Sequence, residues 1–405
     1  MTERLSYGRQ TIDEADIAAV VDALRSPMLT AGPLVGRFEA ALAGWVGAGH
    51  ATVCSSGTAA LHLAYAALGI GEADEIITTP ITFSATAAAA YYVGARVRIA
   101  DVDPRTGNLT PASVEPLITP RTRAIVPVHL AGLPADLEEL TQLARQRGLR
   151  IVEDACHALG ATYHGQRIGA GASDAVVLSF HPVKHITTGE GGAILVRDPD
   201  VQRRLERLRS HGIERDPAHF TSHPATTQAT TRATIDAPWI HEVQELGWNY
   251  RLPDIACALG LSQLAKLDAF LDARRRIAAT YRVELAAAFG PDHPDAGVRP
   301  PPEFADRSSA YHLFTVAIDF ERYNTTRGRV MRALADAGIG TQVHYIPLLD
   351  HPLHAQRCPD ERARPRPGAD HYYARTLSLP IYPQLAQIDV RRVVGELHRI
   401  LGESP

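Results

Sequence analysis

Lys184 stands a few residues beyond an apolar run and just before a group of glycines, in the segment LSFHPVKHITTGEGG (178–192). The preceding DAVVLSF (174–180) has the continuous apolar character of a strand buried on both faces. Glycines behind the lysine indicate backbone that turns sharply or approaches another group closely. Because α/β sheets bind ligands at the carboxyl ends of their strands, the pattern predicts an amine at the opening of a ligand site.

Two further groups along the chain are placed to share that site. Asp154 ends the apolar run RIVED (150–154), and a carboxylate at the carboxyl end of a central strand faces the ligand crevice. The segment SSGT (55–58) joins an apolar run to a helix, where free N–H groups can hold a phosphate. Each motif alone is equally typical of an ordinary helix cap. The segment lacks GxxxxGK[ST], which excludes a Walker-type phosphate loop.

The order of these groups predicts a cofactor. A strand-end acid and a lysine beyond the next strand are the two protein groups that pyridoxal 5′-phosphate (PLP) needs most. Lys184 would bind it covalently, and Asp154 would keep the pyridine nitrogen protonated, so that the ring accepts electrons from a carbanion. Ser179 is placed for a phosphate oxygen, although a buried serine bonded to backbone fits as well. His157, one helical turn beyond Asp154, would contact the ring hydroxyl or simply fill space.

Composition limits the class of protein. The chain of 405 residues is longer than a single hydrophobic core usually supports, which predicts two domains. They are a large α/β domain (1–255) that binds PLP and a small C-terminal α+β domain (256–405). A formal net charge of −4 gives no general attraction for nucleic acid or an anionic membrane. No apolar stretch approaches the roughly 20 residues of a membrane helix, so a cytoplasmic protein is expected. The four cysteines form no CxxC pair, and no metal site is predicted.

The pattern along the chain predicts the fold class. From about 50 to 200, short apolar runs alternate with helix-like segments, which indicates βαβ units and a mostly parallel sheet with helices on both faces. The irregular excursion 214–240 has few large aliphatic residues, and loops of this length are commonly functional or mobile. A long helical stretch (253–289) and a Pro-rich segment follow. The elements expected beyond them are strands at 312–320 and 340–348 and helices at 327–338 and 389–402.

Longer motifs make the chain similar to one family. They are SSGTAALHLAY (55–65), DEIITTPITFSATA (74–87), IVEDACHALGA (151–161), SFHPVKHITTGEGGAI (179–194), RSHGI (209–213), ELGWNYRLPDIACALGLSQL (245–264) and TQVHYIPL (341–348). In this order, over nearly the whole chain, they resemble the DegT/DnrJ/EryC1/StrS family of nucleotide-sugar aminotransferases. The resemblance implies PLP as cofactor and PLP fold type I, the aspartate-aminotransferase-like α/β fold.

The resemblance also implies roles for individual residues. Lys184 would carry the cofactor and then move a proton between it and the substrate, with Asp154 at the ring nitrogen and His157 near the ring oxygen. The further contacts are Phe83 on the ring face, Gly57, Thr58 and Ser179 at the phosphate, and Asn249 at the phosphate in the neighbouring subunit, which implies a homodimer. Those expected on the substrate or amino-donor side are Arg251, His344 and Tyr345.

The implied reaction is transamination in two halves. L-glutamate gives up its amino group and leaves as 2-oxoglutarate, and C4 of a 4-keto-6-deoxy nucleotide sugar then takes the group. A UDP-linked N-acetylhexosamine of pseudaminic acid biosynthesis is the expected substrate, and a dTDP-linked or 3-keto sugar is the alternative. Two features depart from the family pattern: His185, where relatives of this branch often have proline, and the length of the 214–240 excursion.

Three other functions compete with transamination. PLP-dependent sugar dehydratases of the same fold carry histidine in place of the lysine, so Lys184 argues against them. A non-catalytic sensor or scaffold would be expected to lose Asp154 or Lys184, or to gain a DNA-binding segment. An NAD-dependent sugar enzyme needs G-x-G-x-x-G in its first βα unit, where this chain has SSGTAA (55–60). The sequence therefore favours transamination.

Overall fold

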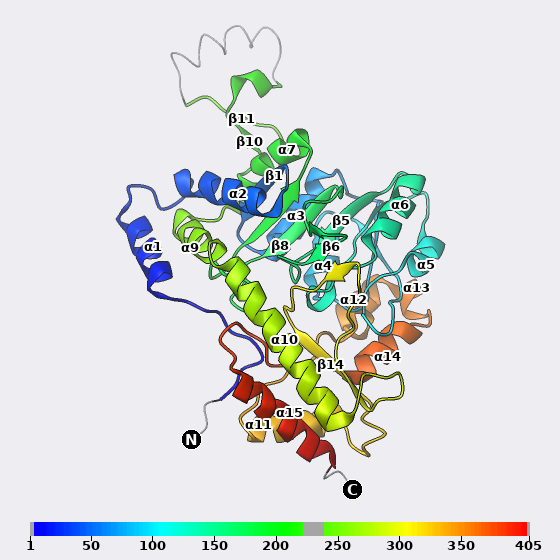
Figure 1. Cartoon of the computed structure of the whole chain (residues 1–405). Coiled ribbons are helices and arrows are strands. Elements are labelled where there is room, and N and C mark those ends of the chain that lie inside the picture. Colours follow the sequence, from blue (N-terminus) through cyan, green and yellow to red (C-terminus); the bar gives the residue numbers. More distant parts are fainter. Residues whose placement is uncertain (1–3, 222–238, 403–405) are drawn as a thin grey trace.

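A seven-stranded sheet forms the centre of the computed structural model, which describes residues 4–221 and 239–402 (Figure 1). In spatial order its strands are β1 (His50–Cys54), β9 (Gly192–Val196), β8 (Ala175–Ser179), β5 (Arg150–Asp154), β4 (Thr122–Ile125), β2 (Glu75–Thr78) and β3 (Arg96–Ile99). Only β9 runs against the others in this sheet, pairing antiparallel with β1 and β8. Its short connection from β8 contains no helix, whereas a parallel crossover usually needs one.

Helices cover both faces of this sheet. They are α2 (Pro33–Val46), α3 (Gly57–Ala67), α4 (Ala85–Tyr92), α5 (Pro111–Val114), α6 (Leu137–Arg147), α7 (Pro199–Arg209), α9 (Asp254–Leu264) and α10 (Leu267–Phe289). Val177 of β8 packs with α3, α4 and α7 on one face. Its neighbours Val176 and Leu178 pack with α2, α9 and the start of α10 on the other. Both faces are therefore apolar, and the predicted α/β fold is confirmed.

The C-terminal part builds a second core beside the main sheet (Figure 1). Its elements are β12 (Val298–Arg299), β14 (Phe314–Ile318), β15 (Thr376–Leu379), α11 (Arg327–Asp336) and α15 (Gln387–Gly402). β14 pairs antiparallel with β12 and β15, and the later half of α10 packs on them with α11 and α15. α10 thus contributes to both cores, and Leu5 near the N-terminus joins the second one. The predicted boundary at 255 stays a prediction.

Two expected elements differ in the structure. The segment 340–348 is not the predicted strand: Gln342 alone forms an isolated bridge, with Ser378 of the edge strand β15, and the residues after it leave that edge. The predicted helical stretch 253–289 is two helices, α9 and α10. They part near Lys266, whose amine is 2.8 Å from Asp13 Oδ1 and 2.6 Å from Asp16 Oδ2. These ion pairs connect the junction between α9 and α10 to the N-terminal helix.

The other elements lie outside these two cores or are short. They are α1 (Glu14–Arg25), α12 (Pro352–Arg357), α13 (Pro359–Arg362), α14 (Pro367–Arg375), β6 (Thr162–Tyr163), β7 (Gln166–Arg167), β10 (Ile213–Glu214), β11 (Glu242–Val243), β13 (Arg307–Ser308), and the 3-10 turns η1 (Glu115–Leu117), η2 (Leu130–Gly132), η3 (Pro217–His219) and η4 (Leu348–Asp350). β10 and β11 pair with each other on either side of the 214–240 excursion, most of which (222–238) lies outside the described residues.

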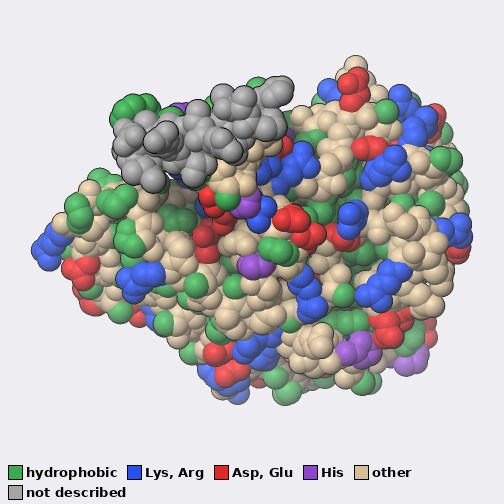
Figure 2. Space-filling model, turned by 90° about the horizontal axis from the view of Figure 1, so that it is seen from above, with side chains coloured by type: hydrophobic (Ala, Val, Ile, Leu, Met, Phe, Trp, Pro, Cys, Tyr) green, Lys and Arg blue, Asp and Glu red, His purple; other side chains and the backbone are tan. Residues whose placement is uncertain are grey.

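The surface carries mixed charge. Figure 2 shows Lys, Arg, Asp and Glu side chains interspersed over the described part of one face. Among the helices that the structure describes, none combines the length and the apolar character needed to cross a membrane.

Candidate active site

The carboxyl ends of the central strands open onto a cavity of about 660 Å³. All of the predicted site residues except Asn249 and Arg251 line it: Gly57, Thr58, Phe83, Asp154, His157, Ser179, Lys184, His344 and Tyr345. Because β1, β5 and β8 run in the same direction, the groups that follow their carboxyl ends meet at one edge of the sheet. The fold thus gathers residues that lie far apart in the sequence.

The start of α3 reaches this cavity through close backbone packing. Ser56 caps the helix by accepting the N–H of Ala59 at 3.0 Å, and the first N–H groups of a helix have no partner inside it. A Cβ at Gly57 would lie 3.0 Å from Ser179 Cβ, and one at Gly192 would lie 2.5 Å from the Ser56 carbonyl oxygen. Only glycine permits this approach, which brings the positive end of α3 against β8 and β9.

Asp154 is the last residue of β5 and is 6% exposed. The Thr86 hydroxyl of α4 donates to its Oδ2 at 2.7 Å, and the Cys156 N–H donates to its Oδ1 at 3.2 Å. Two donors on different oxygens fix the plane of the carboxylate. A carboxylate held in this way suits the protonated nitrogen of a heteroaromatic ring.

Lys184 lies in the turn after β8, where its N–H donates to the His181 carbonyl at 2.9 Å. Burial lowers the pKa of the Lys184 amine, and the nearby Cys156 and Asp154 act in the opposite direction. A lysine that loses its proton more readily than usual can act as nucleophile and as general base. The Lys184 environment therefore fits both of the tasks predicted for it.

His157 lies beside Lys184 as a buried imidazole. Its Nε2 is 3.1 Å from the Tyr345 hydroxyl oxygen, and its Nδ1 is buried with no partner among the described residues. Burial lowers the pKa of His157 well below its usual range, and Lys184, His344 and His185 add to the effect. His157 is therefore neutral at physiological pH and keeps one nitrogen for a hydrogen bond with a ligand.

Loop residues close the remaining sides of the cavity. Phe83 is 60% exposed, although an aromatic ring of this size is commonly buried, and its centroid is 6.1 Å from that of Tyr345. His344 Nδ1 lies 2.8 Å from Ser378 Oγ, and burial with the charge of Lys184 lowers the His344 pKa to about 4. These loops offer an apolar surface and neutral polar groups to a ring-shaped ligand.

Asn249 and Arg251 lie outside the cavity of the single chain. Asn249 is exposed and forms an isolated bridge with Ser210, and Arg251 is half-buried. The same segment exposes Leu246 to 91%. The structure therefore does not bring these two predicted residues to the Lys184 cavity, and their roles stay predictions that involve a second subunit or the substrate.

Several residues that line the cavity were not predicted from the sequence. They are Tyr7, Glu190 and His312 among others. Tyr7 comes from the extended N-terminal segment, and no local pattern links it to Lys184. His312 stands at the start of the predicted strand 312–320, where a histidine before an apolar run was the available signal. Spatial neighbours contributed by other elements are invisible to spacing along one chain.

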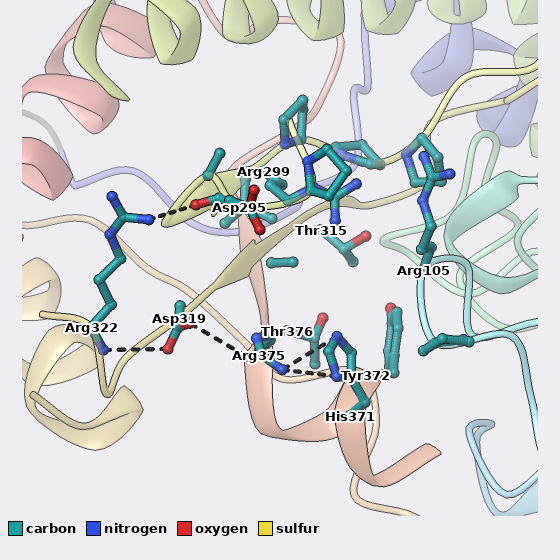
Figure 3. Close-up of a pocket in the computed structure, with 18 residues that line it drawn as sticks. Arg105, Asp295, Arg299, Thr315, Asp319, Arg322, His371, Tyr372, Arg375 and Thr376 are labelled. Carbon is teal, nitrogen blue, oxygen red and sulfur yellow. Dashed lines mark hydrogen bonds and ion pairs between the residues drawn. The ribbon is translucent and has the colours of Figure 1, made fainter. Parts of the chain in front are cut away.

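A second cavity of about 420 Å³ lies against the small sheet (Figure 3). It contains several arginines but no lysine, and none of the predicted site residues lines it. The Arg322 guanidinium donates to the Asp295 carbonyl and its backbone N–H to Asp319, and the Arg375 guanidinium bonds to Asp319 and His371. The guanidinium groups of Arg322 and Arg375 are therefore engaged within the chain. The cavity at Lys184 is therefore the candidate active site.

The residues of the Lys184 cavity fit PLP. A lysine amine, a strand-end carboxylate, an unpartnered imidazole nitrogen on His157 and a helix N-terminus match its aldehyde, ring nitrogen, ring hydroxyl and phosphate. The close approach at Gly57 leaves backbone rather than side chain at the phosphate end.

Comparison with known proteins decides the family. The DegT/DnrJ/EryC1/StrS aminotransferase family model matches residues 10–398. The chain belongs to this family. The spore coat polysaccharide biosynthesis protein SpsC of Bacillus subtilis is 36% identical over 398 residues, which are 98% of this chain and 97% of SpsC.

Solved structures of similar aminotransferases extend the comparison. PseC of Helicobacter pylori, an aminotransferase of pseudaminic acid biosynthesis, has a TM-score of 0.86 and 30% identity, with 99% of this chain and 100% of PseC covered. The PLP form of Spr1654 from Streptococcus pneumoniae has a TM-score of 0.86 and 25% identity, with 99% and 100% covered. DegT-family aminotransferases depend on PLP, so the predicted cofactor is confirmed and the chain is a sugar aminotransferase of this family.

Proposed function

We propose that this DegT-family enzyme transfers the amino group of L-glutamate to C4 of a 4-keto-6-deoxy nucleotide sugar, with a UDP-linked N-acetylhexosamine as substrate. The observation that carries the proposal is the meeting of Lys184, Asp154 and the start of α3 at one cavity. The likeness to PseC over the whole chain supports the class of sugar. A dTDP-linked or 3-keto sugar is the alternative, and the experiment below includes both.

The chain would hold the cofactor through the residues described above. Lys184 would bind its aldehyde carbon, and Asp154 would face its ring nitrogen. Phe83 would cover one ring face, and His157 would bond to the ring oxygen through Nδ1. The residues at the phosphate would be Gly57, Thr58 and Ser179. Bound in this way, PLP supplies an electron sink for the carbanion that forms beside the amino group.

Lys184 would also move the protons of the reaction. In its neutral form the amine would take the proton from Cα of L-glutamate in the first half, and in its protonated form it would deliver a proton to C4 of the sugar in the second. Burial of the amine favours the neutral form that the first step needs. The neutral His344 and the Tyr345 hydroxyl would orient the amino donor or the sugar, together with Arg251.

A homodimer is part of the proposal. Exposed apolar residues cluster in the sequence around Asn249: Trp239 is 72% exposed, Val243 65% and Leu246 91%. Apolar side chains exposed this fully commonly mark a protein interface. A second subunit seated on this segment would bring Asn249 toward the phosphate of the partner's cofactor. The active unit would then be a dimer with shared active sites.

The lysine content of the chain allows a sharp test of the first half-reaction. Lys184 and Lys266 are the only lysines in the sequence. Purified protein with PLP should show a visible absorption band that L-glutamate bleaches. Borohydride reduction should fix the cofactor to Lys184, which peptide mass spectrometry can locate. Lys266→Arg should label as the wild type does, and Lys184→Ala should not label. A label at Lys266, or a band indifferent to glutamate, would contradict the proposal.

The second half-reaction identifies the sugar. The glutamate-treated enzyme should aminate a UDP-linked 4-keto-6-deoxy-N-acetylhexosamine, detected as an amino product by mass spectrometry and as return of the visible band. The comparison substrates are a dTDP-linked 4-keto-6-deoxyhexose and a 3-keto analogue. A higher kcat/KM for either would replace the UDP-linked assignment and would leave the aminotransferase activity standing.

A further inference from the structure

Arg274 of α10 is a buried cation without a carboxylate in ion-pair distance among residues 4–221 and 239–402. Its side chain is 1% exposed, and Nη1 donates to the carbonyls of Tyr311 at 3.1 Å, His312 at 3.3 Å and Ile381 at 3.2 Å. Burial lowers the pKa of Arg274 to about 10, so the guanidinium stays charged at physiological pH. A buried charge without a counter-ion is costly, which indicates a task beyond packing.

The backbone that Arg274 binds is a constrained turn. Tyr311 has a φ of +46°, in the left-handed region that favours glycine. The Ala310 N–H also donates to the Gly132 carbonyl at 3.0 Å, and a Cβ at Gly132 would lie 3.0 Å from the His312 backbone nitrogen. Hydrogen bonds thus hold the turn to both α10 and the η2 segment. Its side chains, His312 among them, have little freedom to reorient.

The turn places His312 in the active-site cavity. Its ring centroid lies 4.3 Å from that of His157 and 5.6 Å from that of His185, the residue after Lys184. His185 Nε2 is 3.1 Å from the Ala310 carbonyl oxygen, so this nitrogen carries the hydrogen. We call His157, His312 and His185 the imidazole row. It runs from the proposed cofactor-binding imidazole to the turn that Arg274 holds.

Cationic side chains act on the imidazole row, namely Lys184 and Arg274 on His312 and also Arg275 on His185. Burial is the main cause that lowers the pKa of His312 well below its usual range. The groups that add to this effect are Lys184, His157, His185 and Arg274, and those acting on His185 also include Arg275. His157 further faces His344 and the Tyr345 hydroxyl. Among the described groups acting on His312 there is no carboxylate, so the row is neutral at physiological pH.

We propose that Arg274 and His312 are positioning residues for the transamination: Arg274 fixes the turn that carries His312, and the His312 ring packs on His157 and fixes its orientation at the cofactor site. A neutral row leaves the proton of Lys184 as the one that this cluster exchanges near neutral pH. The catalytic meaning of the inference rests on the proposed function, whereas the charge state of the row does not.

The first test follows the visible absorption band of the PLP-loaded enzyme against pH. His312→Ala removes the ring that packs on His157 and should shift the midpoint of the band's titration by about one pH unit, the spread that folded environments commonly impose. His312→Phe keeps a ring of similar shape and should stay near the wild-type midpoint. His398→Ala, an exposed histidine of α15, is the matched control. Equal midpoints for the alanine variant and the wild type would overturn the inference.

The second test needs no cofactor. In apoprotein with 15N-labelled histidine, the loss of a signal in His312→Phe identifies the His312 imidazole by NMR. It should be neutral at pH 6, and a protonated ring at that pH would overturn the inference. Arg274→Met should raise the titration midpoints of His185 and His312, and Arg274→Lys should keep them low because it retains the charge. Unchanged midpoints in Arg274→Met would remove Arg274 from the arrangement.

The two tests separate the failure of this inference from that of the proposed function. If Arg274→Met does not fold, the wild-type NMR titration still decides whether the row is neutral. A missing PLP label on Lys184 would end the proposed function and leave the NMR result untouched. A normal label on Lys184 together with a protonated His312 would overturn the inference and leave the proposed function standing.

Discussion

Thr86 and Asp154 are joined by a buried hydrogen bond of 2.7 Å between the threonine hydroxyl and carboxylate Oδ2. Thr82 Oγ1 lies 2.8 Å from Thr86 Oγ1, so a chain of two hydroxyl groups stands behind the acid. The bond links helix α4 to the end of strand β5, and both elements border the cofactor site. The orientation of the strand-end acid therefore depends on a residue outside its own strand.

Thr86→Val should weaken PLP binding about tenfold or more. A hydrogen bond to a charged group contributes about 1.5–3 kcal/mol, and valine keeps the shape of threonine without the donor. The check is the PLP dissociation constant of the apoenzyme, from absorbance or fluorescence titration. Thr82→Val is the matched control, because it leaves the bond between Thr86 and Asp154 in place. Equal affinity for Thr86→Val and the wild type would show that Asp154 needs no such support.

Gly57→Ala should reduce cofactor affinity by crowding the start of α3. The new Cβ would lie 3.0 Å from Ser179 Cβ and 3.2 Å from Cys156 Sγ, so helix and strand must separate at the proposed phosphate site. Gly36→Ala on α2 is the control, since nothing lies within 4 Å of its Cβ. It should bind PLP normally and gain about 0.5–1 kcal/mol of stability in denaturant unfolding. Normal PLP affinity in Gly57→Ala would count against the phosphate role.

Glu75→Gln should destabilise the fold by about 2 kcal/mol at pH 7, because it removes charged hydrogen bonds from a buried site. Glu75 is 1% exposed and lies 2.6 Å from Thr119 Oγ1 and 2.9 Å from Arg121 Nη2. Burial raises its pKa, but Thr119, Arg121 and Arg98 outweigh this, and the net shift is downward. Since the folded-state pKa is the lower one, the stabilisation is present above the unfolded value of about 4.3 and is lost as the pH falls through the folded value.

Urea unfolding at several pH values checks the Glu75 prediction. The difference in unfolding free energy between wild type and Glu75→Gln should be constant from pH 7 to 5 and should shrink below about pH 4.3. Glu72→Gln, an exposed neighbour, should match the wild type throughout. A difference that grows on acidification would reverse the sign assigned here.

Leu246→Asp should break the proposed homodimer. A carboxylate at a side chain that is 91% exposed in one chain costs little in the monomer and much in an apolar interface. Light scattering after size exclusion should give about 44 kDa for the variant and about 88 kDa for the wild type, from a chain mass of 43.8 kDa. Val283→Asp, 68% exposed on α10, is the control. A wild-type monomer that is active would contradict the shared site.

Local patterns in the sequence were enough for the fold class and the cofactor. Apolar runs with strand length predicted the strands of the main sheet, because strands covered on both faces are apolar throughout. Asp154, Lys184 and the start of α3 could be placed at one edge, because groups at the carboxyl ends of parallel strands meet there. The family motifs then supplied the reaction type.

Other features depended on contacts between segments that are distant in the chain. The segment 340–348 has an apolar pattern but pairs with the edge strand β15 only at Gln342, because residues 342–346 line the Lys184 cavity instead of following that edge. His312 and Tyr7 reach Lys184 only after separate elements pack, and Arg274 reaches the 311–312 turn in the same way. The cost of a buried charge or an unpartnered imidazole is set by its surroundings in three dimensions, which spacing along the sequence does not encode.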